Sequence, residues 1–140
     1  MEIAVQIPDT DAVNVFEEEK DQAVDRPELK MWAVVRRDLG MEGGKLVPQA
    51  GHAFLDCALQ ADPDVLAEYQ ETSKSKIALR VKSEGQLLRL HTLCAALGLN
   101  TYLVRDAGRT VFPEPTYTMF AVGPCYRHQL PRQVDKLPML

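Results

Sequence analysis

Lys45, Gln49 and His52 are polar residues at positions i, i+4 and i+7 of a largely apolar stretch that follows the glycine-rich segment GMEGG. On a helix this spacing places all three side chains on one face. The N-terminus of such a helix presents unpaired N–H groups and positive potential to an anion. The pattern suits an anion-binding or reactive site. It equally suits a solvated lysine, a surface glutamine and a half-buried histidine, and spacing alone does not decide between the two.

The glycines before Lys45 do not form a nucleotide triphosphate loop. That motif needs a glycine, four residues and then Gly-Lys-Ser/Thr. Here only three residues separate Gly40 from Gly44, and Leu46 stands where a magnesium-binding hydroxyl is required. The G-x-G-x-x-G pattern of dinucleotide-binding proteins is also absent. If Lys45 has a chemical role, it is therefore not the binding of a nucleotide triphosphate.

A second polar stretch, DAGRT at 106–110, is followed by Thr116 and Thr118. We expect Asp106 to end a strand at the same sheet edge as the loop before Lys45, where open α/β sheets bind ligands. Thr116 and Thr118 alternate with Tyr117, so both should point to one face. The competing interpretation is structural, because aspartate is a common turn former and threonine a common strand residue.

Composition excludes several classes of protein. Cys57, Cys94 and Cys125 are far apart, as are the histidines, so we expect neither a disulfide framework nor a metal site. The N-terminus has no basic start followed by an apolar run, and no segment is long enough to cross a bilayer. These features favour a cytoplasmic protein without a membrane partner.

The net charge of −4 is unevenly distributed along the 140 residues. Residues 1–29 carry nine acidic and two basic side chains, whereas residues 30–140 carry fourteen basic and eleven acidic ones. We therefore expect an acidic arm at 1–29, partly disordered, joined to one mildly basic domain at 30–140.

Hydrophobic patterns in the domain predict alternating strands and helices. We expect strands at 31–35, 75–82, 100–106 and 116–124, with Trp32 in the core. Helices should begin near Lys45, with Pro48 in the first turn, and after the caps Asp62 and Ser83. Gly98 should end the third helix, and a short helix should follow Pro131.

The connection between the last two predicted strands is about nine residues, too short for a helical crossover, so this pair should be antiparallel. The predicted fold class is α/β, a three-layer α/β/α sandwich. Its four-stranded sheet is mixed and mostly parallel, with helices on both faces.

Four motifs in order resemble the type 2 peptidyl-tRNA hydrolases, over about residues 30–140. They are KMWAVVRRDLGMEGGK at 30–45, QAGHA at 49–53, DAGRT with its threonine-rich sequel, and VGP at 122–124. The family cleaves the ester that joins a peptide to the 3′ ribose of tRNA, without a metal or other cofactor. The resemblance therefore implies an ester hydrolase whose partner is tRNA. A homodimer is compatible with it, although no segment of the sequence marks an interface.

The resemblance implies that Lys45, Asp106 and Thr118 are catalytic. The positions it implies for substrate binding or support are Gln49, His52, Arg109, Thr110, Thr116, Arg36 and Arg37. Ester hydrolysis needs a placed water, help with its proton and stabilisation of the oxyanion. These residue types favour direct attack by water over an acyl-enzyme, and they leave open which one acts as the base.

Two departures from the family pattern concern charge. The family usually has G-K-G-K where this chain has Glu42-Gly43-Gly44-Lys45, and commonly P-G-T where this chain has Glu114-Pro115-Thr116. Both changes should weaken tRNA binding by reducing counterion release. As a hypothesis, the acidic arm competes with RNA for the basic face. Unchanged tRNA affinity at low salt after deletion of residues 1–28 would contradict that idea.

Two other functions compete with the hydrolase. One is a non-catalytic RNA-binding regulator on the same fold, because fold alone does not guarantee activity. The other is a hydrolase or transferase that acts on a smaller acylated nucleotide. The intact set of Lys45, Asp106 and Thr118 favours an enzyme, and substrates of different length would separate the two enzymes.

Overall fold

The computed structural model describes residues 27–140, so the predicted acidic arm lies almost wholly outside the described residues. The strands are β1 (Lys30–Arg36), β2 (Lys76–Val81), β3 (Thr101–Asp106) and β4 (Thr116–Cys125). The helices are α2 (Gly43–Leu59), α3 (Pro63–Glu71), α4 (Glu84–Ala96) and α5 (Arg132–Asp135), with a 3₁₀ turn η1 (Arg127–Gln129) before α5. All four predicted strands and all four predicted helices are present.

The four strands form one mixed sheet in the order β2-β1-β4-β3. β1 pairs with β2 in parallel, whereas β4 is antiparallel to both β1 and β3. The antiparallel relation predicted for the last two strands is confirmed. β1, β2 and β3 share one direction, but the prediction of a mostly parallel sheet is wrong. Because β4 inserts between β1 and β3, only one of the three strand pairings is parallel.

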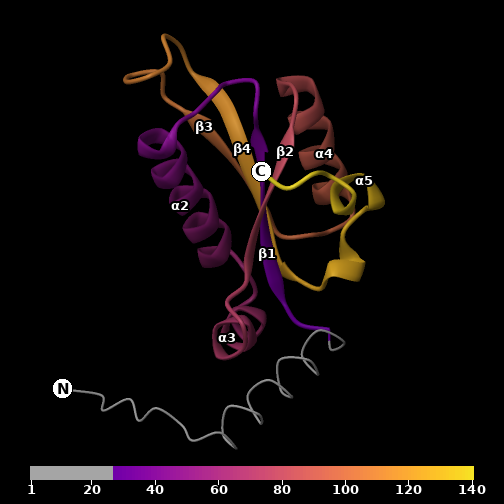
Figure 1. The fold of residues 1–140 in the computed structure, drawn as a ribbon. Coiled ribbons are helices and arrows are strands. Elements are labelled where there is room, and N and C mark those ends of the chain that lie inside the picture. The colour runs from indigo at the N-terminus through magenta and orange to yellow at the C-terminus, as the bar shows by residue number, and fades with distance from the viewer. Residues whose placement is uncertain (1–26) are drawn as a thin grey trace, which may run out of the picture.

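Helices cover both faces of the sheet, which confirms the three-layer α/β/α architecture (Figure 1). On one face, α2 and α3 pack over Met31, Ala33 and Val35 of β1. On the other face, α4 and α5 pack over Trp32 and Val34. The continuous apolar run of β1 is thus explained by burial on both sides, and Trp32 is a core residue with 3% of its surface exposed.

The structure confirms the predicted N-terminal caps of α3 and α4, whereas α2 begins earlier than predicted. The Asp62 side chain accepts a hydrogen bond from the Asp64 N–H at the start of α3, and Ser83 accepts one from the Gln86 N–H at the start of α4. α2 begins at Gly43, two residues before Lys45. The prediction that Pro48 lies in the first turn is therefore wrong. Pro48 lies in the second turn, and having no N–H it cannot donate to the carbonyl of Gly44.

An irregularity in β4 determines which side chains face α2. Val104 pairs with Met119, but the next residue of β3, Arg105, pairs with Tyr117, so Thr118 is an extra residue on β4. Such a bulge interrupts the alternation of side chains and re-aims them. Met119 lies on the α2 face and Thr118 contacts α2 as well, while Tyr117 packs on the α4 face.

One end of the sheet gathers the polar segments singled out above. The end of β1, the start of α2 and the β3–β4 loop lie together there (Figure 1). At the other end of α2, Asn100 donates from its amide to the carbonyls of Cys57 (2.8 Å) and Gly123 (2.7 Å). These bonds fix the helix to the sheet. Within residues 27–140, every helix is too short or too polar to cross a membrane.

Candidate active site

Five of the predicted site residues form one connected cluster between α2 and the ends of β3 and β4. Lys45 Nζ donates to Asp106 Oδ1 at 2.5 Å and to Thr110 Oγ1 at 2.9 Å. Gln49 Nε2 donates to the same Asp106 oxygen at 3.0 Å. Thr118 Oγ1 donates to Gln49 Oε1 at 2.6 Å. Directly bonded members of this network are separated by up to 69 positions in sequence.

Asp106 is the centre of this network, and it is also a turn former. Its Oδ2 accepts a hydrogen bond from the Gly108 N–H at 2.9 Å, which closes an Asx-type turn after β3. Only 9% of Asp106 is exposed. The hydrogen bond from Lys45, helped by those from Gly108 and Gln49, lowers the pKa of the carboxyl below its ordinary value of 3.8 against the opposing effect of burial. Asp106 is therefore ionised at neutral pH.

Gln49 and Thr118 form the buried floor of the cluster. Thr118 is fully buried and Gln49 is 9% exposed. Because the threonine hydroxyl donates to the amide oxygen, the amide nitrogen is directed to Asp106. Thr118 is thus connected to Asp106 only indirectly, through hydrogen bonds of the Gln49 amide, and its hydroxyl is not at the surface of the site.

Lys45 lies between the buried floor of the cluster and the exposed Thr110. Its side chain is 17% exposed, and its ammonium group lies 5.5 Å from the centre of the buried Phe112 ring. An ammonium group has three N–H donors, and among the described residues two of them have acceptors, Asp106 and Thr110. The third remains available to a carbonyl oxygen of a bound substrate.

A groove of about 650 Å³ opens beside Lys45. It is lined by residues from the β1–α2 loop, the start of α2 and the β3–β4 loop: Gly40, Met41, Glu42, Gly44, Lys45, Pro48, Thr110 and Val111. Most of the groove surface is apolar, with Lys45 as the cation and Glu42 as an acid at the helix start. The groove is large enough to hold part of a ligand next to Lys45.

Three further residues expected at the site do not join the cluster: His52 of α2, Arg109 of the β3–β4 loop and Thr116 of β4. His52 is 52% exposed at its side chain and pairs with Asp56 at 2.7 Å, one turn further along α2. Arg109 is exposed and makes no hydrogen bond or ion pair with residues 27–140. Thr116 pairs with Asp106 across the strands, but its hydroxyl donates to the Glu114 carbonyl.

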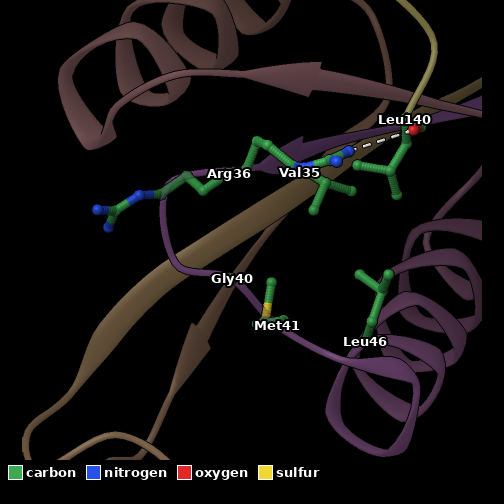
Figure 2. Close-up of a pocket in the computed structure, with 7 residues that line it drawn as sticks. Val35, Arg36, Gly40, Met41, Leu46 and Leu140 are labelled. Carbon is green, nitrogen blue, oxygen red and sulfur yellow. Dashed lines mark hydrogen bonds between the residues drawn. The ribbon is translucent and has the colours of Figure 1, made fainter.

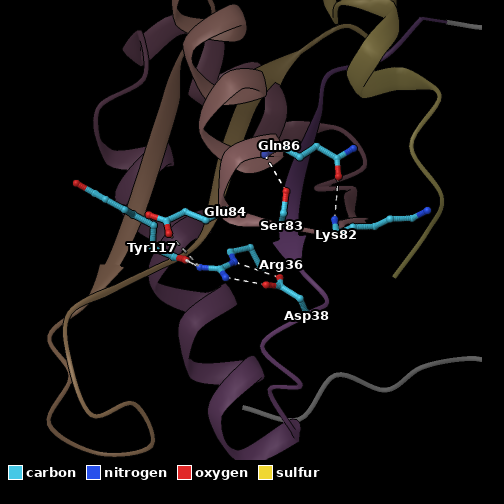
Figure 3. A network of polar contacts seen from close by, with 7 residues as sticks. All are labelled: Arg36, Asp38, Lys82, Ser83, Glu84, Gln86 and Tyr117. Atoms are coloured by element: carbon cyan, nitrogen blue, oxygen red, sulfur yellow. Dashed lines mark hydrogen bonds and ion pairs between the residues drawn. The ribbon is translucent and has the colours of Figure 1, made fainter.

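Arg36 and Arg37 lie on different sides of the end of β1. Arg36 makes a two-pronged contact with Asp38 (3.1 and 2.7 Å) and donates to the Tyr117 carbonyl at 3.1 Å (Figure 3). The hydrogen bond with Asp38 raises the pKa of Arg36. Arg37 is exposed and donates to the Leu140 carbonyl at 3.4 Å. Both line a smaller hollow of about 370 Å³ that shares Gly40 and Met41 with the groove (Figure 2).

Sequence reasoning missed several parts of this site. Gly108 has φ +79°, and a Cβ there would collide with the Glu114 backbone, so glycine allows the loop to fold tightly beside Asp106. The Asp-x-Gly spacing was the available signal for this turn. The buried Phe112 under Lys45 and the bulge at Thr118 had no sequence signal, because both depend on how β3 and β4 pair.

Thiol chemistry is not favoured at any of the three cysteines. Burial raises the pKa of Cys57 and of Cys125 to about 12 and that of Cys94 to about 11. A thiol with so high a pKa forms almost no thiolate at neutral pH. Within residues 27–140 there is no group of three or more His, Cys, Asp or Glu side chains placed to hold a metal ion.

The model of one protein family, described as "Peptidyl-tRNA hydrolase PTH2", matches residues 29–140. A peptidyl-tRNA hydrolase of Methanocaldococcus jannaschii is 34% identical over 112 residues, 78% of this chain and 94% of the relative. A probable peptidyl-tRNA hydrolase 2 of Drosophila melanogaster is 37% identical over 115 residues, 80% of this chain but 62% of the relative. A mouse protein named "Peptidyl-tRNA hydrolase 2, mitochondrial" is 36% identical over 100 residues, 69% of this chain and 55% of the relative.

The match to the family model spans the sheet, both helical layers and every residue of the Lys45–Asp106 cluster. The family suggested by the four sequence motifs is thus confirmed over the whole described domain. The chain belongs to the type 2 peptidyl-tRNA hydrolase family.

Proposed function

We propose that this chain hydrolyses the ester bond between the peptide and the tRNA of peptidyl-tRNA. The observation that carries the proposal is the Lys45–Asp106–Gln49–Thr118 network beside an open groove. Family membership supports the same activity, because the curated relatives are named peptidyl-tRNA hydrolases. The non-catalytic alternative has no comparable support.

In the proposed reaction, Lys45 stabilises the negative charge that develops on the ester carbonyl oxygen. Its free N–H donor and its position next to the groove suit that role. Asp106 and Thr110 hold the ammonium group in place, so little reorganisation accompanies the reaction. Preorganised donors of this kind commonly contribute the largest single part of acyl-transfer catalysis.

The attacking water is proposed to bind at Asp106. A carboxylate oxygen accepts about two hydrogen bonds. Oδ1 already accepts from Lys45 and Gln49, whereas Oδ2 accepts only from Gly108 among the described residues. The second acceptor position of Oδ2 can orient a water molecule. The water oxygen bonds to the carbonyl carbon, the bond to the ribose oxygen breaks, and the proton lost by the water is balanced by protonation of that ribose oxygen.

The other residues are proposed to act around this centre. Thr118 is a positioning residue that acts through Gln49, because it is fully buried. Arg36 positions the ends of β1 and β4 through Asp38 and the Tyr117 carbonyl. Four other predicted site residues lie outside the cluster, and we propose that they contact the tRNA: Arg37, His52, Arg109 and Thr116.

The experiment compares two esters with the same peptide: full peptidyl-tRNA and an N-acylaminoacyl-adenosine that lacks the RNA body. Cleavage of peptidyl-tRNA with a much higher kcat/KM than the small ester is expected, because remote binding energy serves the transition state. Equal values for the two esters would favour an enzyme for small acylated nucleotides. Binding of tRNA without cleavage would support the non-catalytic alternative.

The same assay tests the proposed water attack. Acid-quenched samples should show neither an initial burst of free tRNA nor a peptide attached to the protein by mass spectrometry. A stable acyl-protein would contradict direct attack. A parallel reaction with a chelator is expected to proceed at the same rate, and a loss of rate restored by a divalent cation would overturn the metal-independent mechanism.

A further inference from the structure

Arg105 and Tyr117 form a pair on the face of the sheet opposite the candidate active site. They are cross-strand neighbours on β3 and β4, and the Arg105 guanidinium lies 5.7 Å from the centre of the Tyr117 ring. Each residue is adjacent in sequence to a member of the cluster, Asp106 and Thr118 respectively. The bulge at Thr118 turns the Tyr117 ring to the α4 face while Thr118 contacts α2.

The backbone of Tyr117 is held by a partly exposed polar network. Its carbonyl accepts a hydrogen bond from Arg36, whose other contacts hold it to Asp38 and near Glu84 at 4.0 Å. Figure 3 shows the Tyr117 ring pointing away from this network. A half-buried aromatic ring on a fixed backbone loses little entropy when a flat ligand stacks on it.

Arg105 carries a charge that the described part of the chain does not neutralise. Its side chain is exposed, and it makes no ion pair with residues 27–140. Arg36, nearby, is instead paired with Asp38. A guanidinium that is free on one side and stacked on an aromatic ring on the other suits both a phosphate and the plane of a base.

The position of the pair connects it with the groove. β3 is an edge strand of the sheet, so a single-stranded ligand can pass around its end without obstruction by a further strand. At the end of β3, Asp106 lies on the α2 face of the sheet and Arg105 on the α4 face. The sheet therefore separates the Arg105–Tyr117 pair from the Lys45–Asp106 cluster. The 3′ end of a tRNA is single-stranded, with the peptide ester on its last ribose.

We propose that Arg105 and Tyr117 bind an unpaired nucleotide of the tRNA acceptor end, upstream of the ribose that carries the ester. Tyr117 stacks on the base, and Arg105 contacts a phosphate. This inference rests on the proposed function, because it requires the ester to lie at Lys45. Stacking on an aromatic ring together with a basic contact is a common way for proteins to hold single-stranded RNA. It adds affinity without demanding a particular base.

The first test is binding of deacylated tRNA, which does not depend on catalysis. The full chain is compared with Tyr117→Leu, Tyr117→Phe, Arg105→Gln and Arg105→Lys by fluorescence anisotropy across a range of salt concentrations. Tyr117→Leu should raise Kd about tenfold, while Tyr117→Phe, which keeps the ring, should bind like the unchanged chain. Arg105→Gln should reduce the slope of log K against log salt by about one, and Arg105→Lys should keep it.

The second test places the contact on the acceptor end. With 2-aminopurine in the nucleotides before the terminal adenosine, the unchanged chain should quench fluorescence at one of them and Tyr117→Leu should not.

The outcomes separate this inference from the proposed function. If the unchanged chain cleaves peptidyl-tRNA but all four variants bind tRNA equally well, the pair is only a cross-strand contact and the inference fails. If the affinity falls for Tyr117→Leu but quenching is unaffected at every acceptor position, the nucleotide lies elsewhere and the inference also fails. If the unchanged chain does not cleave peptidyl-tRNA, the proposed function fails first.

Discussion

Asp106 is the residue on which the geometry of the site depends most. It accepts hydrogen bonds from Lys45, Gln49 and Gly108, which come from a helix and from its own turn. A carboxylate held by that many donors is fixed in position and stays ionised. Lys45 is in turn held by the Asp106 carboxylate, so a change at either residue alters the other.

The first prediction concerns stability and pH. The pKa of Asp106 is lowered in the folded protein, chiefly by Lys45. Its contribution to stability is therefore present above the unfolded pKa, near 3.8, and is lost as pH falls through the lower folded value. We expect urea unfolding midpoints to show a smaller decrease below pH 4 in Asp106→Asn than in the unchanged chain. Equal decreases in both proteins would contradict this prediction.

The second prediction concerns Thr118. Replacement by valine keeps the shape but removes the hydrogen bond to Gln49, so the buried amide loses the contact that sets its orientation. We expect kcat to fall on the order of tenfold to a hundredfold, with little change in KM, because the residue does not touch the substrate. Thr92→Val, an exposed substitution on α4, is the matched control. A raised KM with normal kcat in Thr118→Val would indicate direct substrate contact instead.

At the scale of elements, the β3–β4 connection carries most of the site. It begins with the Asp106 turn, supplies Thr110 and Phe112 beside Lys45, and returns into the bulge at Thr118. The loop is held close to itself at Gly108, where no room remains for a side chain next to the Glu114 backbone. A change in the shape of the β3–β4 loop should therefore also change the geometry of the candidate site.

The third prediction compares two glycines with the same backbone angle. Gly108 and Gly98 both have φ +79°, but a Cβ at Gly98 would meet no atom within 4 Å. Gly98→Ala should lose about 1–2 kcal/mol of unfolding free energy from its left-handed conformation alone, with normal kcat. Gly108→Ala should lose more and should also lower kcat, because the loop must move away from Lys45. Similar kinetics for the two variants would show that the loop does not position the site.

The sequence predicted the elements of this fold better than their pairing. The β1 run and the caps Asp62 and Ser83 are local signals, and the structure confirms each. Pro48 was placed one turn too early because two glycines precede Lys45 within the helix itself. The bulge at Thr118 and the insertion of β4 beside β1 depend on contacts distant in sequence, which a single chain does not reveal. Spacing and strand alternation already mark Lys45, Asp106 and Thr118 as candidates, and the resemblance implies their catalytic role, but their connection through Gln49 is visible only in the fold.

At the scale of the whole molecule, charge should control how well the domain binds RNA. The groove carries an acidic residue, Glu42, at the exposed start of α2, beside Gly43, which stands at the position of the first lysine in the family pattern G-K-G-K. Affinity for a polyanion depends on the number of phosphates neutralised, and therefore on salt. The acidic residues before position 30 add to the same balance.

The fourth prediction tests this balance by reversing one charge. Glu42→Lys should strengthen tRNA binding and steepen the dependence of log K on log salt by about one. Glu71→Lys makes the same charge change in the last turn of α3, at the opposite end of the domain (Figure 1). It should leave the slope nearly unchanged. If both variants gain affinity equally, the effect reflects net charge alone and the groove has no special part in RNA binding.

The single-turnover rate of peptidyl-tRNA cleavage by Lys45→Met tests whether the Lys45–Asp106 pair is the catalytic centre. The matched control is Lys136→Met, an exposed lysine after α5. We expect Lys45→Met to lose on the order of a hundredfold or more in rate with its fold intact by circular dichroism, and Lys136→Met to retain full activity. Cleavage by Lys45→Met at the rate of the unchanged chain would contradict the account, because the ester would then be hydrolysed without the ammonium group on which the proposed mechanism depends.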